Sequence, residues 1–219
     1  MVDSIYRSKI RLPGESFLFR GLVILYTVGI AGHLIPATLS LMKSLTPFVL
    51  LISGLIVLIS LRKEQSTKFW VWCTCIFTGT FLIEVIGVTT GNVFGSYEYK
   101  SALGPQLWNV PPIIGWNWLL VILGAVGMSQ RIRNAALFAL SVGTLVLFLD
   151  YILEPAAVKL EYWEWNSPNI PLQNYLGWFV IGAVSAIIYR LLKINIKSKL
   201  PQSYFVIQLV FFAVLRLFL

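Results

Sequence analysis

Long apolar runs, separated by short polar breaks, make up most of this chain. Seven runs have the roughly 17–25 residues that cross the hydrocarbon core of a bilayer as an α-helix. They cover approximately residues 19–41, 45–61, 69–88, 113–129, 134–158, 171–192 and 204–219. The pattern predicts an all-α fold, a polytopic transmembrane helical bundle of about seven spans, in which residues 1–219 form a single integral membrane domain.

The composition agrees with this prediction. The chain is 58% hydrophobic and 12% charged, and its mean hydropathy is +0.80. A water-soluble domain of this size does not expose so little charge. The polar segment 3–15 is not followed by a short apolar core and a small-residue cleavage site, so we expect the first span to be retained.

The basic residues are unevenly distributed and predict the orientation. The net charge is +8. With the N-terminus in the cytoplasm, only Lys43, Lys100 and Lys159 fall in the opposite loops, and Arg216 lies near the chain end. The basic residues on the cytoplasmic side are then Arg7, Lys9, Arg11, Arg20, Arg62, Lys63, Lys68, Arg131, Arg133, Arg190, Lys193, Lys197 and Lys199. The positive-inside rule therefore places the protein in the cytoplasmic (inner) membrane with a cytoplasmic N-terminus. Anionic lipid headgroups can also bind these basic residues, and nothing indicates a nucleic-acid partner.

Two stretches of the chain resemble each other. Glu84 is followed fourteen residues later by Glu98 in a Tyr-Glu-Tyr triplet, and Asp150 is followed fourteen residues later by Glu164 in Trp-Glu-Trp. Each stretch continues to an Asn-x-Pro triplet and a Gly-Trp pair at the next span. The spacing predicts an internal repeat of two-helix units, 69–129 and 134–192, which brings Glu84 and Asp150 to equivalent positions facing one cavity. Repeat interfaces in membrane folds often hold the functional site. A chance match is the alternative.

Three acids and the single histidine lie inside predicted spans: Glu84, Asp150, Glu154 and His33. All lie in the outer half of the bilayer, and Glu154 is one helical turn from Asp150. A carboxylate in lipid costs several kcal/mol, so these acids are candidates for function. The structural alternatives are that Glu154 only orients the loop near Pro155 and that His33 is a hydrogen-bonded packing residue.

The buried acids suggest a particular chemistry. Desolvation and a second carboxyl nearby favour the neutral form of a carboxylic acid. A neutral acid can protonate an unactivated alkene, and aromatic rings such as those of Tyr97, Tyr99, Trp163 and Trp165 can stabilise the resulting carbocation. The alternative for these four rings is a belt at the membrane interface.

Some functions are excluded by residue counts. The single histidine cannot build a multi-histidine di-iron centre or a bis-histidine haem site. The seventh span has no lysine for a retinal Schiff base. The counts therefore argue against redox hydroxylation and against a retinal chromophore.

An ordered series of motifs between residues 70 and 190 resembles the membrane carotenoid-biosynthesis family, which includes carotenoid hydratases of the bisanhydrobacterioruberin hydratase type. The motifs are Glu84-Val-Ile-Gly-Val-Thr-Thr-Gly91, Phe94-Gly95-Ser-Tyr97-Glu-Tyr99, Leu103-Gly104, Val110-Pro111, Asn117-Trp118, Asp150-Tyr-Ile-Leu-Glu154-Pro155-Ala156, Trp163-Glu-Trp165, Ile170-Pro171 and Asn174-Tyr-Leu-Gly177-Trp178. The first two spans and the last match only in hydropathy.

The resemblance implies a cofactor-independent hydro-lyase that adds water to the terminal double bond of a linear carotenoid (ψ end group) and gives a tertiary alcohol. Glu84, Asp150 and Glu154 are then the catalytic candidates. The candidates for substrate binding are His33, Tyr97, Tyr99, Asn117, Trp163, Trp165 and Asn174. The expected partners are the carotenoid and membrane lipid, with other carotenoid-pathway enzymes as further candidates. The resemblance implies neither a metal nor a cofactor. The alternatives are a carotenoid end-group cyclase, a carotenoid- or lipid-binding protein without enzymatic activity, and a proton-coupled transporter.

Overall fold

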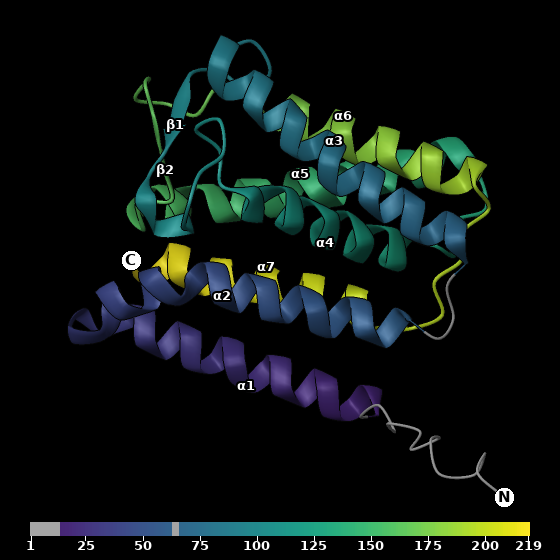
Figure 1. Cartoon of the computed structure of the whole chain (residues 1–219), viewed down its shortest axis with the longest axis horizontal. Helices are drawn as coiled ribbons and strands as arrows, with labels where there is room; N and C mark the ends of the chain where they lie inside the picture. The colour runs from purple at the N-terminus through teal and green to yellow at the C-terminus, as the bar shows by residue number, and fades with distance from the viewer. Residues whose placement is uncertain (1–13, 63–65) are drawn as a thin grey trace, which may run out of the picture.

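The computed structural model describes residues 14–62 and 66–219 (Figure 1). In these residues, seven helices are long and apolar enough to cross a membrane, as predicted. They are α1 (Glu15–Leu34), α2 (Pro36–Leu61), α3 (Thr67–Thr90), α4 (Pro112–Ser129), α5 (Ala135–Lys159), α6 (Leu172–Leu191) and α7 (Leu200–Phe218). Arg7, Lys9, Arg11 and Lys63, which contribute to the predicted orientation, lie outside the described residues.

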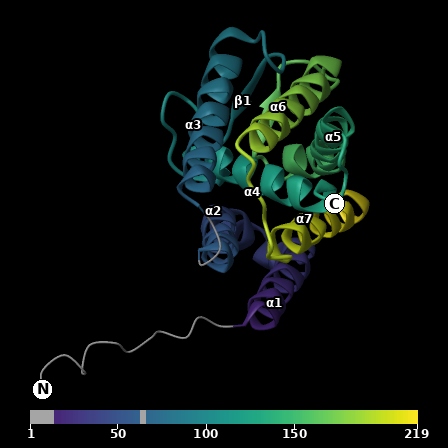
Figure 2. The ribbon, with the colours of Figure 1, turned by 90° about the vertical axis from the view of Figure 1, so that its right-hand side faces the viewer.

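The helices run back and forth along the long axis of the molecule, with α4 at the centre (Figures 1 and 2). In its most apolar segment 67% of the α4 residues are buried, compared with 17% in α1 and 22% in α2. The helices α3, α5 and α6 lie on one side of α4, and α1, α2 and α7 lie on the other. The hairpin of α1 and α2 therefore forms an outer wall of the bundle.

The first span ends earlier than the hydropathy pattern predicts. We expected a span to residue 41, but α1 ends at Leu34 and α2 begins at Pro36. Ile35, between them, is extended at φ −95° and ψ 114°, because the proline ring disfavours helical geometry in the preceding residue. Proline is itself well suited to the first turn of the next helix. As a consequence Lys43 lies within α2 instead of a loop, and it pairs with Glu161.

Two short strands join the loops that follow α3 and α5. The strands β1 (Tyr97–Tyr99) and β2 (Trp163–Trp165) pair antiparallel, with Glu98 opposite Glu164. Like charges opposite each other are destabilising, and Lys100 contacts both carboxylates, at 2.7 Å from Glu164. Its hydrogen bonds to Glu164 and Glu98 raise the pKa of Lys100 above its usual range. The register is the one expected for two equivalent units, although the repeat itself stays a prediction.

Glycines allow the closest helix contact. Helices α5 and α6 cross where Gly143 meets Gly182, and a Cβ added to Gly182 would lie 3.2 Å from the Cα of Gly143. A Cβ on Gly143 would lie 2.7 Å from the carbonyl oxygen of Phe179. Small residues let helix backbones approach in this way inside membranes. The close contact fixes α5, which carries two of the three buried acids, against α6.

Candidate functional site

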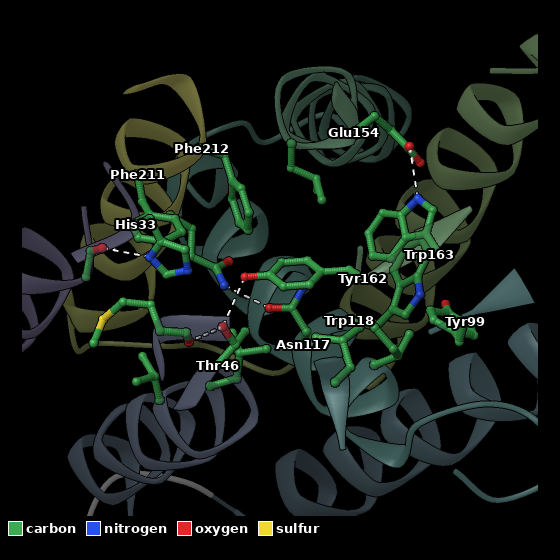
Figure 3. A pocket seen from close by; sticks show the side chains of 18 of the residues that line it. His33, Thr46, Tyr99, Asn117, Trp118, Glu154, Tyr162, Trp163, Phe211 and Phe212 are labelled. Carbon is green, nitrogen blue, oxygen red and sulfur yellow. Dashed lines mark hydrogen bonds between the residues drawn. The ribbon is translucent and has the colours of Figure 1, made fainter. Parts of the chain in front are cut away.

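A cavity of about 170 Å³ lies beneath the two strands, between the α1–α2 hairpin and the remaining helices. Its lining is mostly apolar and aromatic. It is smaller than the roughly 300–1,000 Å³ that encloses a drug-sized ligand, so it can hold only one end of a long molecule. Figure 3 shows the two ends of the cavity, one with Glu154, Trp163, Trp118 and Tyr99 and the other with His33, Thr46, Phe211 and Phe212.

Glu84 of α3 is buried and accepts three hydrogen bonds. The hydroxyl groups of Tyr97 and Tyr99 donate to its Oε2, the latter at 2.8 Å, and the indole Nε1 of Trp118 donates to its Oε1 at 2.7 Å. The tyrosines lie on β1, outside the helices. Burial and the neighbouring Glu84 raise the pKa of both phenols, so they remain protonated and can donate. The three donors hold the carboxyl group in one orientation at the wall of the cavity.

Glu154 of α5 is the second acid in the cavity wall. The indole Nε1 atoms of Trp163 and Trp165 donate to its Oε2, each at 3.1 Å. The amide Nδ2 of Asn174 donates to Glu154 Oε1 at 3.3 Å and to Asp150 Oδ2 at 2.7 Å. Indole N–H and amide NH₂ groups can donate but not accept. Glu154 is therefore held as an acceptor at both oxygens.

Asp150 is fully buried one turn from Glu154, but it does not line the cavity. Its Oδ2 accepts from Asn174, and its Oδ1 has no hydrogen-bond partner among the residues that the structure describes. We expected Glu84 and Asp150 to face one cavity. In the structure the second acid in the cavity wall is Glu154 instead. Asp150 lies one turn away on α5, and its shorter side chain does not reach the cavity.

Aromatic rings surround the acids. The indoles of Trp118 and Trp178 stack with ring centroids 3.9 Å apart, and Phe94 stacks on Trp118 at 6.4 Å. Tyr97 and Trp165, from opposite strands, lie 5.0 Å apart. The pairing of β1 with β2 thus brings ring faces and acid-binding donors from both halves of the chain to one place.

The other end of the cavity has fewer polar groups. The Nδ1 of His33 lies 2.7 Å from the carbonyl oxygen of Gly29 and donates to it. Asn117 Oδ1 accepts from Gln208 Nε2 at 2.8 Å. Thr46 and Tyr162 share a hydrogen bond at 3.0 Å. The imidazole of His33 is therefore held by a hydrogen bond within α1, and the side-chain amides of Asn117 and Gln208 bond to each other.

Of the ten residues that the sequence singled out, all except Asp150 line the cavity. Several other lining residues were missed, namely Trp178, Tyr162, Gln208, Phe211 and Phe212. Gln208 is a polar residue in the middle of an apolar span, and that signal could have identified it. The described residues contain no group of three or more His, Cys, Asp or Glu side chains that could hold a metal ion.

Comparisons with known proteins place the chain in a family. The family model of carotenoid biosynthesis proteins matches residues 45–219. Over 119 residues the chain is 32% identical to bisanhydrobacterioruberin hydratase of Haloarcula japonica, a match that covers 49% of this chain and 40% of the relative. No solved structure matches. The family match includes Glu84, Asp150 and Glu154, and it shows that the chain belongs to the carotenoid biosynthesis protein family. With its seven apolar helices, the chain is an integral membrane protein of that family.

Proposed function

We propose that this protein is a carotenoid hydratase that adds water to the terminal double bond of a linear carotenoid and gives a tertiary alcohol, without a cofactor. One observation carries the proposal: two buried acids, Glu84 and Glu154, line a single apolar and aromatic cavity inside a membrane bundle. Alkene hydration needs a proton donor, a cation-stabilising surface and exclusion of bulk water. The family and the name of the relative support the same reaction class.

Glu84 is the proton donor in this proposal. Two of its three partners are tyrosine hydroxyls, which can accept a hydrogen bond as well as donate one. A protonated Glu84 can therefore be accommodated. The alkene electron pair takes the proton to form a C–H bond at the less substituted carbon, and the positive charge develops on the tertiary carbon. The donors from Tyr97, Tyr99 and Trp118 then stabilise the carboxylate that remains.

Glu154 acts as the counter-charge to the cation. The indole N–H groups of Trp163 and Trp165 and the NH₂ group of Asn174, which contact it, can only donate, so they favour an ionised carboxylate at this position. The unpartnered Oδ1 of Asp150 is the oxygen of this pair that can carry a proton. Asp150 is in this account a positioning residue that acts through Asn174 and Glu154.

Aromatic and polar side chains in the cavity wall serve the two remaining needs of the reaction, which are to stabilise the cation and to position the water. The ring faces of Trp118 and Trp178 offer electron density to the tertiary cation. Water then attacks the cation with an oxygen lone pair and releases one proton, which restores the acid. Asn117, Asn174 and His33 are the candidates for positioning this water, since all three line the cavity. We place the enzyme in the cytoplasmic membrane with a cytoplasmic N-terminus, where other carotenoid-pathway enzymes are potential partners.

The proposal is tested by producing the protein in a host that accumulates a linear carotenoid and analysing the pigments. A hydratase gives a product that is heavier by one water molecule. A cyclase gives an isomer of unchanged mass, and a binding protein or transporter gives no new pigment. The matched control is the Glu84→Gln variant at equal abundance, which should give no hydrated pigment. Either of the other two pigment profiles from the unmodified protein would overturn the proposal.

A further inference from the structure

The wall of the cavity that α1 and α2 supply is incomplete. Among the lining residues on these two helices, only Tyr26 and His33 are buried. The lining residues from β1, β2 and α3–α7 are buried, apart from Asn117 and Trp165, which are partly exposed. The cavity is therefore closed on the side of α3–α7 and open on the side of the hairpin, which faces the lipid.

Val28 of α1 and Leu45 of α2 mark the opening. Both line the cavity, and they are also 58% and 39% exposed. Nearer the turn the hairpin is closed, since a Cβ on Gly32 would lie 2.5 Å from the sulfur of Met42. Glu84 lines the same cavity from α3, so the opening leads to this acid.

We propose that the gap between Val28 and Leu45 is the entrance through which a long, linear isoprenoid chain passes sideways from the lipid into the cavity. This inference rests on the proposed function for the identity of the substrate. The end group reaches Glu84 and Glu154 at the closed side. The rest of the polyene stays between the hairpin and the surrounding lipid, because a cavity of about 170 Å³ cannot enclose it.

The chemistry of the path suits this occupant. The hairpin residues along it are mainly apolar, including Leu25, Val49 and Leu50, and the rings of Phe211 and Phe212 face them from α7. The nearby ammonium group of Lys43 is paired with Glu161, and Lys43 does not line the cavity. A hydrocarbon chain can cross such a passage without desolvating a charge, whereas a charged headgroup cannot.

Narrowing the entrance should slow turnover. We expect Val28→Trp and Leu45→Trp to lower the initial rate at limiting carotenoid by at least about tenfold, since a new indole would occupy the gap. The matched controls are Ile24→Trp and Leu41→Trp, one turn earlier on the same helices. Ile24 is 64% exposed and Leu41 is 54% exposed, so each is more exposed than the residue on the same helix for which it is the control. Neither control residue lines the cavity. They should stay within about twofold of the unmodified rate.

A binding readout separates this inference from the proposed reaction. A diazirine amino acid at position 28 or 45, irradiated in membranes that contain a linear carotenoid, should form a carotenoid adduct, and the same group at 24 or 41 should react only with phospholipid. Carotenoid adducts at positions 28 and 45 without any hydrated product would support the proposed entrance and refute the proposed hydratase activity. Equal carotenoid adducts at all four positions, phospholipid adducts alone at 28 and 45, or unchanged rates in both tryptophan variants would refute the entrance.

Discussion

The Glu84→Gln variant should lose hydration while keeping its fold. The glutamine carbonyl can still accept from Trp118, and its NH₂ group can donate to the hydroxyl oxygens of Tyr97 and Tyr99. Each of the three partners thus keeps a hydrogen bond to residue 84, but the two phenol O–H groups lose their acceptor, so we expect a stability loss of about 1–3 kcal/mol. The amide cannot deliver a proton to carbon. Loss of a general acid lowers the rate by about 10²–10⁴, which corresponds to about 3–5 kcal/mol of activation free energy.

The Glu84→Ala variant provides the contrast. It removes the same acid but leaves three buried donors without an acceptor, at about 1–3 kcal/mol each. This variant should therefore lose both activity and stability. Comparing the two variants separates the catalytic role of the carboxyl group from its structural role, because the alanine variant removes all three hydrogen bonds to residue 84 and the glutamine variant keeps a partner for each group.

The assay measures conversion of a linear carotenoid in isolated membranes, normalised to protein abundance, together with thermal unfolding in detergent. Glu98→Gln is the matched control, since this glutamate is 62% exposed on β1 and contacts Lys100 instead of the cavity; it should retain activity. Turnover within about threefold of the unmodified protein in Glu84→Gln, at normal abundance, would remove Glu84 as the proton donor.

Three further predictions concern the second acid of the cavity, the packing of α5 against α6, and the orientation in the membrane. Glu154→Gln should lower turnover at least tenfold and more than Asp150→Asn does, because only Glu154 lines the cavity; the reverse order in carotenoid conversion would contradict the roles proposed for the pair. Gly143→Ala should destabilise the bundle by about 1–3 kcal/mol, because its Cβ would lie 2.7 Å from a carbonyl oxygen of α6, whereas Gly79→Ala, with no atom within 4 Å, should leave the unfolding temperature unchanged or higher. A cysteine at the exposed Ser96 should react with an impermeant thiol reagent from the outer face; labelling from the cytoplasmic face alone would reverse the proposed orientation.

The fold could be predicted because the signal for a membrane span is local. A run of about twenty apolar residues must satisfy its backbone hydrogen bonds within itself in lipid, so it forms a helix whatever its neighbours are. The break at Ile35 was missed because a hydropathy window averages across one proline. Pro36 could have indicated the break, because a proline disfavours helical geometry in the residue before it. The same rule that located the spans therefore placed the first boundary several residues too late.

The site was predicted less completely, because it depends on how helices rotate and pair. Sequence spacing identified three acids, but it could not decide that Glu154 and not Asp150 lines the cavity, since that depends on the rotation of α5. Trp178 and Gln208 contribute because α6 and α7 pack beside α4. Such contacts are set by close packing between distant segments. The spacing of the Tyr-Glu-Tyr and Trp-Glu-Trp triplets did indicate a relation between the two loops, whose strands pair in the structure.

The hydration reaction can be tested most directly by oxygen labelling. Membranes that contain the unmodified protein and a linear carotenoid are incubated in water enriched in heavy oxygen, and the products are analysed by mass spectrometry, with Glu84→Gln membranes as the control. Our account predicts a tertiary alcohol that carries the heavy oxygen atom, formed in the absence of molecular oxygen and added cofactors, and none in the control. An alcohol whose oxygen does not come from water, or an isomer without new oxygen, would contradict it.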